Sequence, residues 1–330
     1  MKNKKNLDIT NSFKVKDIFY KYAVGAKPFL KWAGGKNQLL SVFRKFYPKE
    51  LLKGEIKNYY EPFVGGGAVF FDIAQNYGID SAFLYDINEE LVLTYKVVQK
   101  DVNSLIEFLH RYSNQYLSLK REKREQYYYE LRHNFNLQRF NIDYDKYSEN
   151  WVSRAAQIIF LNKTCYNGLF RFNSKGEFNS PFGLYDNPKI LDENNLLNVS
   201  KLLEIAEIKK ADFKEVRQDI KKSSFIYFDP PYRPLSKTSN FTSYSKYQFK
   251  DDDQIQLASL FNELNEMDCL LMLSNSDPKN TDPTDNFFDI IYKGYNIRRV
   301  SAKRIINSNV KKRNSINEII VTNYSTDENK

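Results

Sequence analysis

The chain of 330 residues has little cysteine and histidine and no long apolar run. Its only cysteines, Cys165 and Cys269, are too few for a disulfide framework, and two histidines leave little material for a zinc site. No segment approaches the roughly 18 consecutive apolar residues that a membrane-spanning helix needs. The N-terminus is rich in Lys and Asn and lacks the apolar core of a signal peptide. These absences predict a protein with no bound metal and no membrane association that works in the cytoplasm.

Positive charge exceeds negative charge, with 50 Lys and Arg against 41 Asp and Glu and a net charge of +9. Such an excess favours a polyanionic partner, because phosphates release counterions when Lys and Arg bind them. Composition alone leaves the partner open, since chains encoded by AT-rich genomes are also rich in Lys and Asn. The apolar fraction of 42% is sufficient for a large core.

A strand, a glycine-rich turn, a helix and a second strand follow one another early in the chain. Residues 58–63 form an apolar and aromatic run that leads into Gly65-Gly66-Gly67. Residues 68–77 then have helical periodicity, and the short strand at 81–85 is closed by Asp86. An amphipathic helix is expected before this unit, at residues 38–46. The order is typical of the start of a doubly wound α/β sheet.

Later segments complete the expected fold. Three further apolar runs are expected to be strands, at residues 224–228, 269–274 and 318–324. Helical patterns lie between the two groups of strands, at residues 91–133 and 151–163. Residues 170–182 alternate around a turn, as in a β-hairpin. We therefore predict a Rossmann-like α/β domain of residues 1–100 and 205–330, interrupted by a mainly helical insertion at 101–204 that carries the hairpin.

The glycine-rich turn is a candidate ligand site. Consecutive glycines after a strand let a ligand approach main-chain atoms, and a carboxylate at the end of the next strand can accept hydrogen bonds from ribose hydroxyls. Gly65 to Gly67 and Asp86 meet these requirements, although they do not match the dinucleotide fingerprint. A tight structural turn with a helix-capping Asp fits the same residues equally well.

A second motif, Asp229-Pro230-Pro231-Tyr232, follows the apolar strand at residues 224–228. The two prolines make a stiff loop at the carboxyl end of the sheet, where open α/β sheets place their chemistry. An exocyclic amino group is a poor nucleophile, and a carboxylate with a backbone carbonyl can hold both of its hydrogens. Asp229 and the Pro230 carbonyl suit this orienting role, and Tyr232 can stack on an extruded base. The alternative is a Pro-rich loop with a capping Asp and a packing Tyr.

Four segments together resemble the Dam-type (D12 class) family of adenine-specific DNA methyltransferases, including the GATC methylases of restriction–modification systems. They are residues 29–36, 61–67, 162–183 and 229–232, in the family's order. The resemblance implies S-adenosylmethionine as cofactor. It assigns the following residues to the cofactor site: Trp32, Gly35, Lys36, Phe63, Gly65, Asp86, Asp212, Phe213 and Asp229. For Asp212, a solvated surface acid is the equally weighted alternative.

The same resemblance makes residues 162–183 a DNA-reading hairpin. Arg171 can donate two hydrogen bonds to a guanine edge in the major groove. Tyr166 can fill the stack that a flipped base leaves. The residues assigned to DNA are Lys31, which the family places on a guanine, Tyr166, Asn167, Leu169, Arg171 and Pro181. A basic segment at residues 301–313 either contacts phosphates or is a solvated surface.

The expected activity is methylation of the N6 amino group of a flipped adenine in double-stranded DNA, within GATC or a GAT-containing site. The catalytic residues are expected to be Asp229, Pro230 and Tyr232, with direct transfer and no covalent intermediate. We expect a monomer at the bacterial nucleoid, paired functionally with a cognate restriction endonuclease. Methylation of adenine in RNA or of a protein amide is the alternative reaction. A DNA-binding regulator or a nicotinamide dehydrogenase would leave the Asp-Pro-Pro-Tyr loop without a role.

Overall fold

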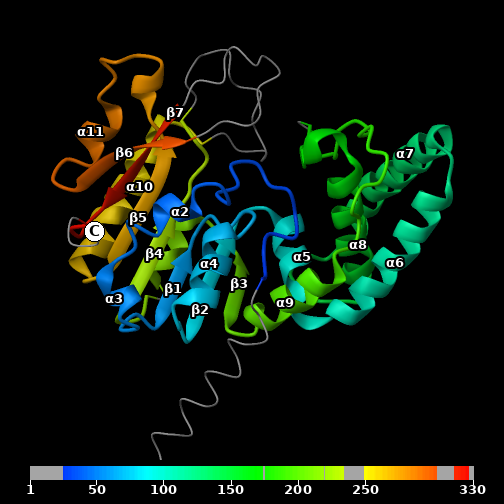
Figure 1. Ribbon diagram of the computed structural model, residues 1–330, viewed down its shortest axis with the longest axis horizontal. Helices are drawn as coiled ribbons and strands as arrows, with labels where there is room; N and C mark the ends of the chain where they lie inside the picture. Colours follow the sequence, from blue (N-terminus) through cyan, green and yellow to red (C-terminus); the bar gives the residue numbers. More distant parts are fainter. Residues whose placement is uncertain (1–24, 174, 219, 234–248, 303–315, 327–330) are drawn as a thin grey trace, which may run out of the picture.

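A mixed seven-stranded sheet forms the centre of the protein (Figure 1). The computed structural model describes residues 25–173, 175–218, 220–233, 249–302 and 316–326. The strands are β1 (Asn58–Glu61), β2 (Ser81–Asp86), β3 (Ala206–Lys210), β4 (Ser224–Phe228), β5 (Leu270–Ser276), β6 (Asn296–Ala302) and β7 (Ile316–Thr322). Their order is β3-β2-β1-β4-β5-β7-β6, and β7 runs antiparallel to both of its neighbours.

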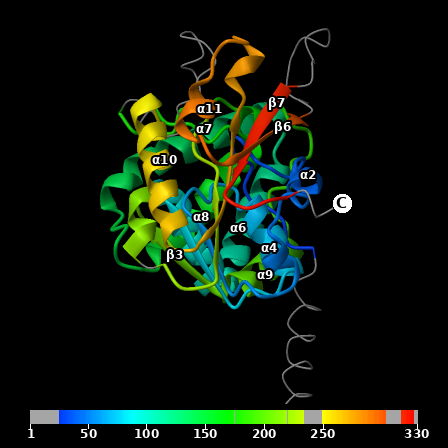
Figure 2. The ribbon, with the colours of Figure 1, turned by 90° about the vertical axis from the view of Figure 1, so that its left-hand side faces the viewer.

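Helices cover both faces of this sheet, as Figure 2 shows for α4 and α10 on opposite sides. Alternate residues of β4 point into two separate cores, because successive side chains of a strand face opposite ways. Phe225 and Tyr227 join the core that includes α2, α4 and α5. Ile226 and Phe228 join the core that includes α10 and α11. The predicted doubly wound, Rossmann-like α/β sheet is confirmed.

The helices on the sheet and beyond it have the following bounds: α2 (Leu40–Phe43), α3 (Lys49–Leu52), α4 (Ala68–Asn76), α5 (Glu89–Lys100), α6 (Val102–Ser118), α7 (Arg121–Gln138), α8 (Asn150–Thr164), α9 (Glu193–Leu203), α10 (Asp251–Glu266) and α11 (Phe287–Ile291). The helix expected at 38–46 is thus confined to α2. No helix in the described ranges is both long and apolar enough to cross a membrane.

The direction of the strand order reverses between β1 and β4. β1 pairs in parallel with β2 on one side and with β4 on the other, so these three strands end at the same edge of the sheet. Such a switch point opens a crevice beyond the carboxyl ends of the strands, where open α/β sheets bind ligands. The glycine-rich turn follows β1 and the Asp-Pro-Pro-Tyr loop follows β4, so the fold brings both motifs to this edge.

The described residues between β2 and β3 include the five α-helices α5 to α9, of which α6, α7 and α8 gather on the right in Figure 1, away from the strands. A buried ion pair connects this group to α5, because the Arg154 guanidinium of α8 binds the Glu90 carboxylate through two nitrogens. Tyr144 donates a further hydrogen bond to Glu90 at 2.7 Å. The division of the chain into a catalytic domain and an inserted recognition domain remains a prediction.

Several local features differ from the pattern in the sequence. β3 and β6 were not expected, and both lie at edges of the sheet. The expected hairpin pairs through two isolated antiparallel bridges, Cys165 with Phe182 and Phe172 with Phe178. The basic residues proposed to contact phosphates in the segment 301–313, namely Lys303, Arg304, Lys311, Lys312 and Arg313, lie outside the described residues.

Candidate active site

Asp229 stands at the carboxyl end of β4 and has two partners there. Lys36 Nζ lies 2.7 Å from Asp229 Oδ2, and Ser274 of β5 donates a hydrogen bond to Oδ1 at 3.2 Å. Lys36 is almost fully buried, whereas 20% of the Asp229 side chain is exposed. Burial raises the pKa of Asp229, while Lys36 and the Ser274 hydroxyl oppose that rise. The ion pair therefore favours the carboxylate form, which can accept hydrogen bonds.

Tyr232 lies next to this ion pair. Its ring centroid is 4.7 Å from the Lys36 ammonium, which is a cation–π distance. The Tyr232 hydroxyl donates a hydrogen bond to Glu318 Oε2 on β7 at 2.7 Å. The structure thus brings Lys36, Asp229 and Tyr232 together, and it places Ser274 and Glu318 beside them, which the sequence motifs did not indicate.

Arg233 anchors the far end of the proline loop. Its guanidinium binds both carboxylate oxygens of Asp251 at 2.7 and 2.9 Å, and it binds Asp285 at 2.6 Å. Gln254 of α10, a fully buried residue, donates a hydrogen bond to the Pro231 carbonyl at 3.1 Å. These contacts, together with the two ring-restrained φ angles, limit the freedom of the loop.

The glycine-rich turn lies against Trp32. Gly65 has a φ of +47°, and a Cβ atom at this position would be only 3.0 Å from Trp32 Cδ1, so a larger residue has neither the space nor the backbone freedom. The Gly65 N–H donates to Asp86 Oδ2 at 3.1 Å, and the Asn88 N–H donates to Asp86 Oδ1 at 2.9 Å. Burial raises the pKa of Asp86 to about 6, against these amide hydrogen bonds.

The remaining residues assigned to the cofactor are divided between an aromatic cluster and the surface. The rings of Phe63 and Phe213 are stacked with centroids 5.4 Å apart, and Phe249 packs edge-on against Phe63. Asp212 is exposed, and its carboxylate accepts the Lys214 N–H at 3.0 Å. Gly35 is exposed too, and its N–H donates to the Trp32 carbonyl at 3.3 Å.

Glu61 is a buried acid for which the sequence motifs predicted no role. It ends β1, is only 2% exposed, and accepts a hydrogen bond from the Tyr59 hydroxyl at 2.7 Å. Burial raises its pKa well above the ordinary value; the charge of Asp229 also raises it and that of Lys36 lowers it. Glu61 therefore couples electrostatically to both members of the ion pair. Its position directly before the glycine turn was the available signal in the sequence.

Lys31 is held beside the segment expected to read DNA. Asn162 accepts the Lys31 N–H and donates to the Lys31 carbonyl, both at 2.8 Å. A Cβ atom on Gly168, whose φ is +67°, would lie 2.3 Å from Lys31 Cδ. Only glycine permits this approach. The Lys31 ammonium stands 4.8 Å from the centroid of the Tyr185 ring.

The other residues assigned to DNA lie in the segment 162–183, to which Asn162 ties Lys31. Tyr166 is 54% exposed, and its N–H donates to the carbonyl of the exposed Pro181 at 2.9 Å. Asn167 is exposed with a φ of 57°, and Leu169 is half-buried. Arg171 Nε donates to Asn179 Oδ1 at 2.9 Å. The structure therefore collects these residues, although their contacts with DNA remain predictions.

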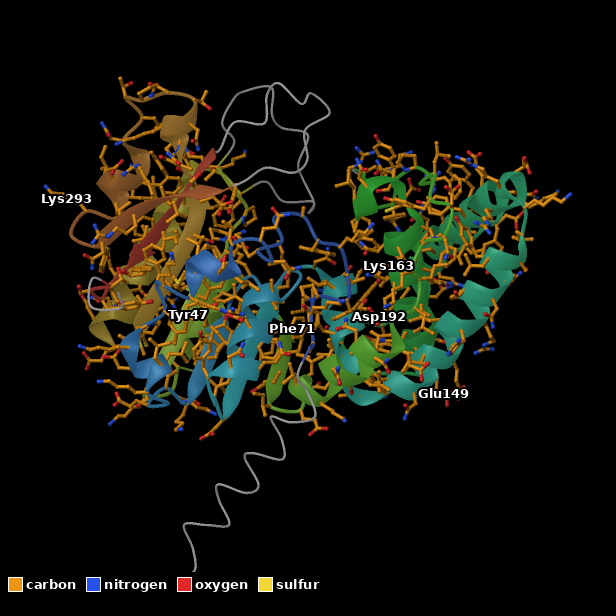
Figure 3. All side chains as sticks on the ribbon, viewed as in Figure 1. Tyr47, Phe71, Glu149, Lys163, Asp192 and Lys293 are labelled. Carbon is orange, nitrogen blue, oxygen red and sulfur yellow. The ribbon has the colours of Figure 1, made fainter. Side chains whose placement is uncertain are left out.

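A small cavity lies where α8 and α9 meet the segment before Lys31, and Figure 3 labels two of its lining residues, Lys163 and Asp192. Burial, together with the charges of neighbouring lysines, lowers the pKa of Lys163 to about 8. This cavity is not the crevice at the switch point. The described part of the chain contains no cluster of three or more His, Cys, Asp or Glu that could hold a metal ion.

The sheet and the groups at its switch point define an α/β enzyme with a Rossmann-like methyltransferase fold. The family of D12 class N6 adenine-specific DNA methyltransferases matches residues 32–306. The chain belongs to this family and is an adenine-specific DNA methyltransferase.

Three relatives illustrate the similarity. The type II methyltransferase M.MjaIII of Methanocaldococcus jannaschii is 52% identical over 299 residues, which cover 90% of this chain and 99% of that protein. The type II methyltransferase M1.LlaDCHI of Lactococcus lactis is 36% identical, covering 93% of this chain and 99% of that protein. A DNA adenine methylase of Haemophilus influenzae is 34% identical, covering 89% of this chain and 92% of that protein.

Proposed function

We propose that this enzyme transfers a methyl group from S-adenosylmethionine to the N6 amino group of an adenine flipped out of double-stranded DNA. The observation that carries the proposal is the meeting of Asp229, Tyr232 and Lys36 at the switch point of the sheet. The glycine turn after β1 and Asp86 after β2 lie at the same edge. A methyl donor and an acceptor base can therefore meet in one crevice.

The groups around the glycine turn fit the proposed cofactor. Asp86 offers a carboxylate for ribose hydroxyls, Trp32 lies on Gly65, and the Phe63 and Phe213 rings offer an apolar surface for an adenine. Lys36 and Gly35 are proposed to complete the site, and the exposed Asp212 is proposed to contact the cofactor's adenine. When bound, the cofactor supplies an electrophilic methyl group on a sulfonium.

Asp229 is proposed to orient the adenine amino group. Its carboxylate accepts one N6 hydrogen and the Pro230 carbonyl accepts the other, while the Pro231 carbonyl is already bound by Gln254. The negative carboxylate also stabilises the positive charge that develops on N6 as the amine takes the methyl group from the sulfonium, which would leave as a neutral thioether, and the surplus N6 proton would leave along its hydrogen bond to that carboxylate. Because Lys36 holds Asp229 Oδ2 at 2.7 Å, binding of the base exchanges this ion pair for the amino hydrogen bond. Tyr232 stacks on the flipped base.

Residues 101–204 are proposed to recognise DNA, with residues 1–100 and 205–330 as the catalytic domain. Lys31, Asn167, Leu169, Arg171 and Pro181 would contact the duplex around a GATC or GAT-containing site, and Tyr166 would fill the vacated stack. Two of the relatives are named type II methyltransferases. We accordingly propose that the enzyme acts as a monomer in the cytoplasm, at the nucleoid, and is paired with a restriction endonuclease.

The activity is tested with tritiated S-adenosylmethionine. Incorporation is measured into duplex DNA with GATC, the same duplex with a changed core base, RNA of the same sequence, and bulk protein. We expect label only in the first duplex, at N6-methyladenine. Label confined to RNA or protein would overturn the proposal that the substrate is DNA. Equal label in both duplexes would overturn the proposed recognition sequence.

The role of Asp229 is tested by Asp229→Ala. Transfer should fall at least about 1,000-fold, because the group that orients and stabilises the nucleophile is lost. Calorimetric titration should show that cofactor binding persists. A variant that methylates DNA at the parental rate would show that the carboxylate has another role.

A further inference from the structure

The one antiparallel strand of the sheet brings a glutamate to the active site. Residues of β7 run opposite to β5, with Ser276 opposite Glu318, so the first half of β7 lies at the edge where the parallel strands end. Ile319, Ile320 and Val321 follow with no exposure and fix the strand between the two cores. Glu318 therefore has a rigid backbone directly beside the proline loop.

The Glu318 carboxylate binds the tip of Tyr232, as the 2.7 Å hydrogen bond from the hydroxyl to Oε2 shows. A hydrogen bond at the far end of a tyrosine side chain restricts χ1, which sets where the ring lies, whereas the hydroxyl oxygen lies on the χ2 axis and does not move when the ring turns about it. The Lys36 ammonium over the ring at 4.7 Å adds a second restraint. Burial and the neighbouring carboxylates of Asp229 and Glu318 raise the pKa of Tyr232, so its hydroxyl stays a donor at neutral pH.

We propose that Glu318 is a positioning residue, which holds the Tyr232 hydroxyl and thereby fixes the position of the ring on which the flipped adenine stacks. This inference rests on the proposed function. A base that stacks on a correctly held ring presents its amino group to Asp229, and a ring free to move about χ1 presents it less often. Glu318 does not touch the base and acts only through Tyr232.

A double-mutant cycle in the full-length enzyme tests the proposal. Tyr232→Phe keeps the ring and removes only the hydroxyl, and Glu318→Ala removes the acceptor. Each change should lower kcat about ten-fold, the effect expected for one hydrogen bond to a charged group. The double variant should be no slower than either single variant, because both changes remove the same contact. KM for the cofactor should not change.

Two further measurements separate positioning from a general structural effect. Glu318→Gln retains an oxygen acceptor and should restore most of the activity lost in Glu318→Ala. With 2-aminopurine at the target position, Tyr232→Phe and Glu318→Ala should give the same increase in fluorescence over the unmutated complex, because the flipped base stacks less firmly. Glu207→Gln is the matched control, since Glu207 lies on β3 at the opposite edge of the sheet.

The outcomes distinguish this inference from the proposed function. If the unmutated enzyme fails to methylate adenine in duplex DNA, the proposed function is wrong. If it is active and the two losses multiply to about 100-fold, or if Tyr232→Phe retains full kcat, Glu318 does not act through Tyr232. Tyr232→Phe decides the question even if Glu318→Ala does not fold, because it removes a single oxygen from a partly exposed side chain.

Discussion

Two buried ion pairs in this enzyme have opposite designs. Arg154 and Glu90 join α8 to α5, and their side chains are 1% and 7% exposed. The guanidinium also donates to the Phe135 carbonyl, and Tyr144 donates to the carboxylate. Lys36 and Asp229 join the start of the described chain to β4, and Asp229 is 20% exposed. Both members of the first pair are thus almost fully buried and bound by further protein groups, whereas the carboxylate of the second pair is partly open to solvent.

The difference shows how one fold can contain an ion pair that stays intact and another whose members can change partners. Arginine presents a planar fork that locks onto a carboxylate, whereas lysine presents a single charge on a flexible stem. A pair made with lysine beside a crevice can exchange partners, and a saturated arginine pair cannot without unfolding its surroundings. Loss of the Arg154–Glu90 pair should therefore lower mainly the stability of the protein. Loss of the Lys36–Asp229 pair should lower mainly its catalytic activity. Three predictions test this division, and a fourth concerns Asp86, a buried carboxyl that has backbone N–H groups as its partners.

The largest expected effect is on stability. Arg154→Met leaves the Glu90 carboxylate buried without its cation and should lower the free energy of unfolding by about 3–5 kcal/mol. Urea unfolding followed by circular dichroism measures this change, and the kcat of the folded fraction should stay within about two-fold. Arg217→Met, which breaks an exposed pair with Glu263, is the control and should cost less than about 1 kcal/mol. Equal losses in the two variants would refute the distinction.

The second effect is on catalysis and its pH dependence. Lys36→Met should lower kcat about 100-fold at saturating cofactor, with little change in unfolding free energy. Lys36 lowers the pKa of Asp229, so its removal raises that pKa and protonates the carboxylate at higher pH. The acidic limb of the profile of kcat/KM for DNA against pH, which reports the free enzyme with its ion pair, should therefore move upward in pH. Lys45→Met, on an exposed site, is the control. An unmoved limb would mean that Lys36 does not hold Asp229 ionised.

The third effect is a smaller loss of stability. Tyr144→Phe removes the neutral partner of Glu90 and should lower the free energy of unfolding by about 1.5 kcal/mol, as for one hydrogen bond to a charged group. Combined with Arg154→Met, its effect should not be additive, because both residues bind the same carboxylate. Urea unfolding of the two single variants and the double variant checks this. Fully additive losses would argue against a single cooperative network.

The fourth effect concerns Asp86, a buried carboxyl held by backbone N–H groups. Burial raises its pKa to about 6, so it gains a proton as the pH falls through that value. A protonated carboxyl accepts ribose hydrogen bonds less well, and cofactor Kd should rise about ten-fold between pH 7 and pH 5. Calorimetric titration measures this, and Asp86→Asn should bind weakly at both pH values. If the Kd of the unmutated enzyme for the cofactor does not change with pH, Asp86 does not bind the cofactor.

Strands with continuous apolar runs were predictable from the sequence, and the edge strands were not. β4 is Ser-Phe-Ile-Tyr-Phe and is buried throughout, because helices cover both of its faces. β3 reads Ala-Glu-Ile-Lys-Lys and has exposed positions, and β6 contains Arg298 and Arg299. Charged residues on edge strands discourage pairing with other chains. They also interrupt the apolar alternation from which a strand is predicted.

Some residues of the candidate active site were likewise predictable from the sequence, and others were not. Residues that occur in contiguous motifs, such as Asp229 with Tyr232 or Gly65 with its neighbours, could be identified because their chemistry is local in sequence. Ser274 and Glu318 could not, since they become neighbours of the loop only through the pairing of β5 with β4 and β7. Which partners a side chain has depends on strand register, and single-sequence patterns do not determine register.

The position of β7 has a consequence for synthesis of the enzyme. β7 is inserted between β5 and β6, and β6 pairs with no other strand in the described sheet. While the ribosome has not yet released residues 316–322, β6 has no partner and the acceptor for Tyr232 is missing. We expect a nascent chain to remain inactive until β7 enters the sheet; activity in ribosome-arrested chains ending before Ile316 would contradict this.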